Sequence, residues 1–231
     1  QGKDGAEEWK GVPNGLPVTE LSLPEYDNNH NSCIWGYMWG YDWNSAEKGD
    51  NISKPKTDAD FTPLGLMNYS EVCFLKAEAA LRGWQGAGDA KTNYENGIRA
   101  SFEEMRANAP KDSYSKSNDD KYISEGNVAW NNADSFEAKL EKIITQKWIG
   151  IYPNSEEAWA EFRRTGYPKL NPVKQSLEPT INPKNGEFIK KLRYVDNELS
   201  NNKEYATDPT LNGGQGDGLS VRVWWDTARY K

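Results

Sequence analysis

Four stretches between residues 66 and 166 repeat apolar side chains at helical spacing, and this pattern limits the fold more than any other feature of the chain. The expected helices cover residues 69–82, 89–107, 135–151 and 155–165. In the second helix an apolar side chain falls at every third or fourth position, at Tyr94, Ile98, Phe102 and Met105. Such spacing places these side chains on one helical face, so the sequence predicts a mostly α-helical protein.

The expected helix ends carry their own residue types. Three helices begin with an Asn or Asp followed three residues later by Glu, at Asn68/Glu71, Asp134/Glu137 and Asn154/Glu157. This capping box satisfies backbone N–H groups that the first turn leaves free. Asp89 is the expected cap of the second helix, and Gly83 and Gly166 are expected to end the first and the last.

The first two helices also resemble a tetratricopeptide pair. Ala90, Tyr94 and Gly97 follow the small, aromatic, small spacing of the second helix of such a repeat, and only a short turn at 83–88 separates the two helices. Small residues at these positions let two helices approach closely. The sequence therefore predicts a close helix pair within this region.

The rest of the chain is expected to be irregular. We divide one single region into an irregular, aromatic-rich segment 1–62, a helical segment 63–166 and an irregular segment 167–231. Polar residues make 108–133 loop-like. Repeated prolines exclude a long helix after 167, and alternating apolar residues predict short strands at 188–195 and around Val221–Trp225.

Composition excludes several classes of protein. The 28 aromatic rings exclude a disordered chain, and the net charge of −7, most of it in residues 1–62, argues against a nucleic-acid partner. The single histidine, His30, makes a His-based zinc site or catalytic triad improbable. We expect no cofactor and no metal, since Asp58 and Asp60 alone do not specify a calcium site. Cys73 is expected in the core.

Several blocks of sequence carry a family resemblance. They read NYSEVCFLKAEAALRGW at 68–84, ENGIRASFEEM at 95–105 and ITQKWIGIYPNSEEAWAEFRRTGYPKL at 144–170. The chain closes with Lys190-Lys191, Glu198 and Trp224-Trp225-Asp226. The order and spacing of these blocks resemble the SusD/RagB family of nutrient-binding outer-membrane lipoproteins. The chain departs from the family pattern with Lys190-Lys191 where an Arg pair is usual, and with Val195 in place of Pro.

The resemblance implies a fold and a role. It implies a SusD-like fold with tetratricopeptide-type helix pairs, long irregular segments and a few short strands, of which this chain is the C-terminal half. It implies a surface lipoprotein of the outer membrane that captures glycans or other nutrients without catalysis and delivers them to a SusC-type TonB-dependent transporter. Membrane association is expected only through an N-terminal lipid anchor that this chain lacks.

Structural roles are expected for several residues of the matched blocks. Trp148 and Trp159 are expected in the core. Arg163 and Arg164 end a helix, where cations interact favourably with free carbonyls. Trp224, Trp225 and Asp226 are expected to hold the end of the chain onto the fold.

An aromatic row in the first segment is the candidate ligand site. The stretch 34–43 reads IWGYMWGYDW, so that Trp35, Tyr37, Trp39, Tyr41 and Trp43 recur with period two. In an extended strand these rings point to one side. Aromatic rings cover the apolar face of a sugar, while amides such as Asn28 and Asn29 hydrogen-bond its polar rim. The alternative is that most of these rings pack the segment onto the helices.

Two other functions remain open at this level. A helical glycoside hydrolase fragment would use a Glu/Asp pair about 5–10 Å apart across a sugar, and Glu71, Glu78, Glu156 and Glu157 are available. A purely structural transporter subunit would bind the transporter and no ligand.

Overall fold

The computed structural model describes residues 65–108, 116–173, 176 and 178–226. These residues belong to two compact units, one at 65–168 and the other at 169–226. In the described ranges all regular structure is helical. No helix there is long and apolar enough to cross a membrane.

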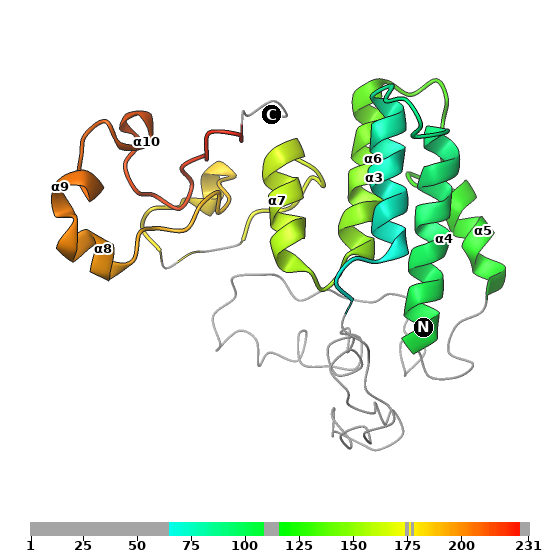
Figure 1. Cartoon of the computed structure of the whole chain (residues 1–231), viewed down its shortest axis with the longest axis horizontal. Coiled ribbons are helices and arrows are strands. Elements are labelled where there is room, and N and C mark those ends of the chain that lie inside the picture. The colour runs from blue at the N-terminus through cyan, green and yellow to red at the C-terminus, as the bar shows by residue number, and fades with distance from the viewer. Residues whose placement is uncertain (1–64, 109–115, 174–175, 177, 227–231) are drawn as a thin grey trace, which may run out of the picture. The chain divides into compact units, whose positions relative to one another are not determined.

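The first unit is a bundle of helices. Its elements are α3 (Tyr69–Leu81), α4 (Ala90–Asn108), the 3₁₀ turn η2 (Lys116–Asn118), α5 (Asp119–Ser124), α6 (Phe136–Gly150) and α7 (Ser155–Thr165). Figure 1 shows α3, α4 and α6 running alongside one another, with α5 against α4. The four helices expected from apolar spacing are therefore confirmed, with their ends within one residue of the expected positions.

One short helix of the first unit was not expected, and neither were the short helical elements within residues 183–214 of the second unit. The polar stretch 108–133 contains α5, whose only buried side chain is Ile123. A single buried residue carries no periodicity, so sequence alone could not identify this helix. A tertiary contact holds it instead, because the Arg106 guanidinium on α4 donates two hydrogen bonds to Asp119, at 3.0 and 2.6 Å.

The caps at the helix starts follow the expected chemistry only in part. Asn154 accepts from the backbone N–H of Glu157 and Asp89 accepts from that of Thr92, as expected. The cap of α6 is Ser135, one residue after the expected Asp134. Asn68 makes no side-chain cap.

A residue from another helix caps α3 in place of Asn68. Glu104 on α4 accepts from both the backbone N–H and the hydroxyl of Ser70, at 3.0 and 2.6 Å. The carboxylate that satisfies this helix start therefore comes from tertiary structure, and the expected partner, Glu71, is free to face another helix.

The hydrophobic core of this unit lies among α3, α4, α5 and α6. Its buried members are Phe74, Ala77, Tyr94, Ile98, Ile123, Leu140, Ile143, Ile144 and Tyr167. Cys73 is buried as expected. Trp148 and Trp159 are only half-buried and do not belong to this core, which corrects the expectation for both.

Gly97 permits the closest approach between α3 and α4. A Cβ atom built on Gly97 would lie 2.7 Å from the Phe74 ring, which is itself fully buried. The small residue expected from the tetratricopeptide-type spacing therefore has a direct steric reason.

Gly97→Ala should lower the free energy of unfolding by about 1–3 kcal/mol, because the added methyl group forces the Phe74 ring out of its position in a packed core. Chemical denaturation of the two proteins measures this difference. Ala100→Gly, on the same helix, serves as a control for helix propensity alone and should cost about 1 kcal/mol. A neutral Gly97→Ala substitution would contradict the close approach.

The second unit contains short helical elements joined by irregular chain. They are η3 (Pro183–Asn185), α8 (Asp196–Asn201), α9 (Lys203–Ala206) and α10 (Leu211–Gly214). The two strands expected at 188–195 and around Val221–Trp225 do not form. The backbone N–H groups of Lys190 and Lys191 both donate to the carbonyl of Leu219, at 2.7 and 3.3 Å. Because one carbonyl takes both bonds, the two segments meet there without a ladder.

Candidate functional site

The ligand site expected from the sequence lies outside the described residues. This holds for the whole aromatic row and for its flanking amides: Trp35, Tyr37, Trp39, Tyr41, Trp43, Asn28 and Asn29. Its assignment as a ligand site therefore stays a prediction.

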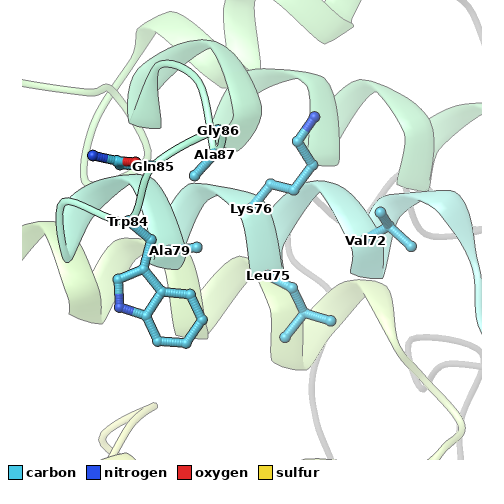
Figure 2. Close-up of a pocket in the computed structure, with 8 residues that line it drawn as sticks. All are labelled: Val72, Leu75, Lys76, Ala79, Trp84, Gln85, Gly86 and Ala87. Carbon is cyan, nitrogen blue, oxygen red and sulfur yellow. The ribbon is translucent and has the colours of Figure 1, made fainter.

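The described residues contain a shallow groove on the outer face of α3. It has a volume of about 470 Å³ and lies between α3 and the turn that follows it. Its lining consists of Val72, Leu75, Lys76, Ala79, Trp84, Gln85, Gly86 and Ala87. Figure 2 shows the Trp84 indole beside Ala79 and Leu75 at one end of the groove, with the Lys76 ammonium at its rim.

This groove offers apolar contact rather than reaction chemistry. Trp84 is 68% exposed and Leu75 is also exposed, so both present apolar surface to solvent. The lining includes no carboxylate, and Lys76 is its only charged residue. An exposed indole with a neighbouring amide, Gln85, can stack on an apolar surface and hydrogen-bond its edge. The sequence did not single out Trp84 because one ring between two glycines has no periodic pattern.

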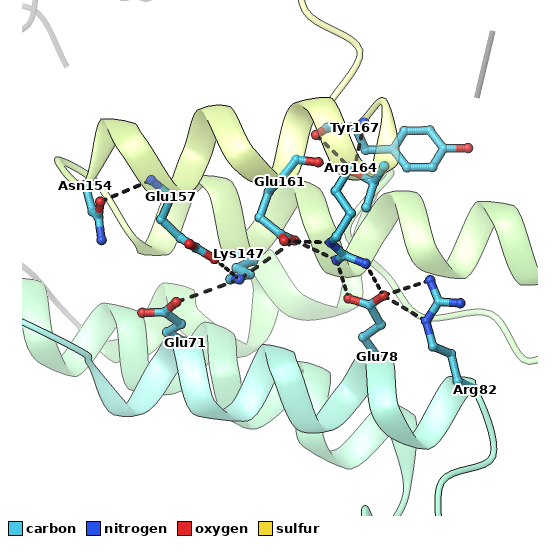
Figure 3. Close-up of polar contacts among 10 residues, drawn as sticks. Glu71, Glu78, Arg82, Lys147, Asn154, Glu157, Glu161, Arg164 and Tyr167 are labelled. Atoms are coloured by element: carbon cyan, nitrogen blue, oxygen red, sulfur yellow. Dashed lines mark hydrogen bonds and ion pairs between the residues drawn. The ribbon is translucent and has the colours of Figure 1, made fainter. Parts of the chain in front are cut away.

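A network of charged residues joins α3, α6 and α7. We call it the α7 ion network; its members are Glu71, Glu78, Arg82, Lys147, Glu157, Glu161 and Arg164 (Figure 3). At its centre Lys147 is 1% exposed, and its ammonium lies 2.8 Å from Glu157, 3.7 Å from Glu71 and 3.7 Å from Glu161. Three carboxylates from two helices thus surround one buried cation on the third.

The other half of the network centres on Arg164. Its guanidinium donates to both oxygens of Glu78, at 2.8 and 2.7 Å, and also to Glu161, at 2.9 Å. Arg82 donates a further bond to Glu78 at 2.9 Å. Bidentate bonds between guanidinium and carboxylate fix geometry as well as charge. Arg164 therefore ties α7 to α3, a role beyond the helix-end interaction expected from the sequence.

The carboxylates of the network differ in proton affinity. Burial raises the pKa of Glu71, and the nearby charges of Glu157 and Glu161 raise it further, while Lys147 only partly compensates. Burial alone would also raise the pKa of Glu78, but the hydrogen bonds and charges of Arg164 and Arg82 outweigh it and lower the pKa. Burial alone would lower the pKa of Arg164, but the hydrogen bonds and charges of Glu78 and Glu161 outweigh it and hold that pKa above its ordinary value.

Some of the glutamates expected as helix caps or as candidate catalytic acids are engaged in ion pairs. Glu71 and Glu157 were read as caps, yet both side chains face Lys147, and Glu78 is engaged by two guanidinium groups. Glu157, Glu161 and Arg164 follow one another at intervals of four and three residues, so they lie on one face of α7. That spacing was readable in the sequence, but the partners on α3 and α6 were not.

The second unit brings together residues of the closing motif. The Asp226 carboxylate is buried, and it pairs with the Lys190 ammonium at 3.2 Å and with the Arg222 guanidinium at 2.8 Å. Lys191 pairs with Asp217, which also accepts from the backbone N–H of Tyr194. Asp226 therefore ties the closing motif to Lys190 within this unit, in line with its expected structural role.

The neighbouring Trp224 does not share that anchoring role. It is 92% exposed, which corrects the expectation that it holds the C-terminal segment onto the fold. Across both units, the described residues include no group of three or more His, Cys, Asp or Glu side chains that could hold a metal ion.

The chain matches a known protein family over most of its length. A family model described as SusD-like, Susd and RagB outer membrane lipoprotein, matches residues 22–226. This match includes the helical blocks, the closing motif and the aromatic row. The comparison with curated proteins found no match.

Solved structures of similar proteins support the same assignment. A susD homolog from Bacteroides thetaiotaomicron is 32% identical with a TM-score of 0.59, and the match covers 76% of this chain and 40% of that one. A chitin-binding SusD homolog from Flavobacterium johnsoniae is 31% identical with a TM-score of 0.55, covering 84% of this chain and 47% of that one. This chain therefore spans less than half the length of these structures. Over that length, it belongs to the SusD-like family of outer-membrane lipoproteins.

Proposed function

We propose that this chain is part of a protein that captures glycans or other nutrients at the cell surface without catalysis. The captured nutrient passes to a SusC-type TonB-dependent transporter in the outer membrane. The family match over residues 22–226 carries this proposal. The chitin-binding homolog supports a glycan as the ligand class, because chitin is itself a glycan.

The aromatic row is the proposed ligand site. Five rings with period two suit the repeating apolar faces of an extended glycan. Asn28 and Asn29 supply donors and acceptors for hydroxyl groups at the rim. Binding by stacking and hydrogen bonds needs no metal and no nucleophile.

Trp39→Ala, at the centre of the row, should weaken glycan binding by about 1–3 kcal/mol, the contribution of one stacked ring. Isothermal titration calorimetry with the best ligand of a glycan panel measures this loss. Trp224→Ala is the matched control, because it removes an indole of the same size from a 92% exposed position outside the groove on α3. Wild-type affinity in a folded Trp39→Ala protein would exclude the row.

The glycan panel itself separates the three candidate functions. Calorimetric binding without release of reducing sugar supports capture. Release of reducing sugar would instead support the glycoside hydrolase, whose acids would then be sought by Glu→Gln substitution. A folded chain that neither binds nor cleaves any glycan, yet co-purifies with the transporter, would favour the structural subunit.

A further inference from the structure

The way α7 is attached differs from the way the other long helices of its unit are attached. Among the described residues, α3, α4 and α6 all contribute side chains to the hydrophobic core cluster, but no residue of Ser155–Thr165 belongs to it. Phe162 on α7 is buried outside that cluster. The α7 ion network joins α7 to α3 through the two hydrogen bonds that Arg164 donates to Glu78.

The network does not balance its own charge. It contains four carboxylates, which are Glu71, Glu78, Glu157 and Glu161, and three cations, which are Arg82, Lys147 and Arg164. Around Lys147 the imbalance is local, because three carboxylates lie within 4 Å of one ammonium. Glu71 and Glu161 have side chains that are 9% and 7% exposed, so solvent screens this excess only weakly.

We propose that α7 is an acid-releasable helix, which detaches from α3 and α6 at low pH while the hydrophobic core of α3, α4 and α6 stays folded. The charged groups that face α7 are Glu71 and Glu78 from α3 and Lys147 from α6, and Arg82, directly after α3, pairs with Glu78. Its own groups in the contact are Glu157, Glu161 and Arg164. Protonation of Glu78 removes the bidentate partner of Arg164, which is the direct tie between α7 and α3.

The two buried carboxylates of α3 respond to acid with opposite signs. Glu78 has a lowered pKa, so its stabilising contribution is present above the ordinary value of 4.5 and is lost as the pH falls through its folded pKa. Glu71 has a raised pKa, so its contribution is complete below 4.5 and is lost as the pH rises through its folded pKa. The attachment of α7 to α3 is therefore expected to strengthen slightly as the pH falls toward 4.5 and to be lost below pH 4.5.

Hydrogen–deuterium exchange of the full chain over a pH series tests the proposal. After correction for intrinsic exchange rates, the amides of α7 should lose protection at a higher pH than those of α4 and α6. Simultaneous loss in all these helices would overturn the proposal, because α7 would then be part of one cooperative unit. This pH series uses the unsubstituted protein.

Two substitutions test the opposite signs. Glu78→Gln should raise exchange in α7 by about tenfold or more at neutral pH while leaving α6 unchanged, because Arg164 loses its charged partner. Glu71→Gln should leave α7 exchange equal or slower at neutral pH and should remove the slowing of α7 exchange on mild acidification, because the group with the raised pKa is gone. Glu103→Gln is the control, an exposed carboxylate on α4 paired with Arg106 and Lys116. Unchanged α7 exchange in Glu78→Gln, or equal acceleration in both variants, would overturn the proposal.

Discussion

Lys147→Met should lower the free energy of unfolding by about 3–5 kcal/mol at neutral pH, the usual cost of leaving buried charges without their partner. Methionine fills nearly the same volume, so the loss is electrostatic rather than steric. Without the ammonium, Glu71, Glu157 and Glu161 face one another across α3 and α7 with no cation on α6 between them. Urea denaturation followed by circular dichroism measures the difference.

The pH dependence of this substitution distinguishes a charge effect from a packing effect. Burial raises the pKa of Glu71, so this carboxylate takes up a proton as the pH falls and no longer requires a cation, and the cost of Lys147→Met should shrink. Lys139→Met is the control on the same helix, because the Lys139 ammonium donates only to the backbone carbonyl of Asn132 at an exposed position. It should change the stability by about 0.5 kcal/mol or less. A cost for Lys147→Met that is the same at pH 4 and pH 7 would contradict the electrostatic explanation.

Phe74→Ala should lower the free energy of unfolding by about 3–5 kcal/mol, the usual range for removing a fully buried phenyl ring. The ring is 1% exposed, lies edge-on to Tyr94 at a centroid distance of 6.4 Å, and fills the space that Gly97 leaves open. Its removal therefore opens a cavity between α3 and α4, the closest pair in the bundle. Thermal and urea denaturation report the loss.

A double substitution tests whether Phe74 and Gly97 share one contact. Gly97→Ala should cost much less in the Phe74→Ala background, because the ring that the new methyl group meets is absent. Tyr69→Ala, at a 67% exposed position of the same helix, is the control and should change the stability by about 0.5 kcal/mol or less. Additive costs for the Phe74 and Gly97 substitutions would show that the two residues are not coupled.

The outcome for the helix starts shows where local sequence suffices and where it fails. Asn154 caps α7 as expected, because a cap depends on atoms within one turn. The expected pair Asn68/Glu71 fails: Glu104 from α4 accepts from the N–H of Ser70 in the first turn, and the Glu71 carboxylate faces Lys147. The local sequence shows which capping hydrogen bonds are possible. Which of them form depends on the side chains that the neighbouring helix brings close.

The sequence by itself determined the mostly helical fold class, the four long helices and the family, but not the short helices α5, α8, α9 and α10. Apolar spacing and ordered blocks such as 144–170 are local properties of the sequence, which is why they could be recognised without the tertiary structure. It also predicted the aromatic row, whose role as a ligand site awaits the binding measurements.

Only the tertiary structure decided how the charged residues combine. In the sequence, these are ordinary charged residues spread over three helices and up to 93 positions apart: Glu71, Glu78, Lys147, Glu161 and Arg164. Their structural role comes from the packing of α3, α6 and α7. This packing buries them and brings four carboxylates into contact with three cations. Electrostatic energy depends on distance and burial, and neither is encoded in the spacing of residues along one helix.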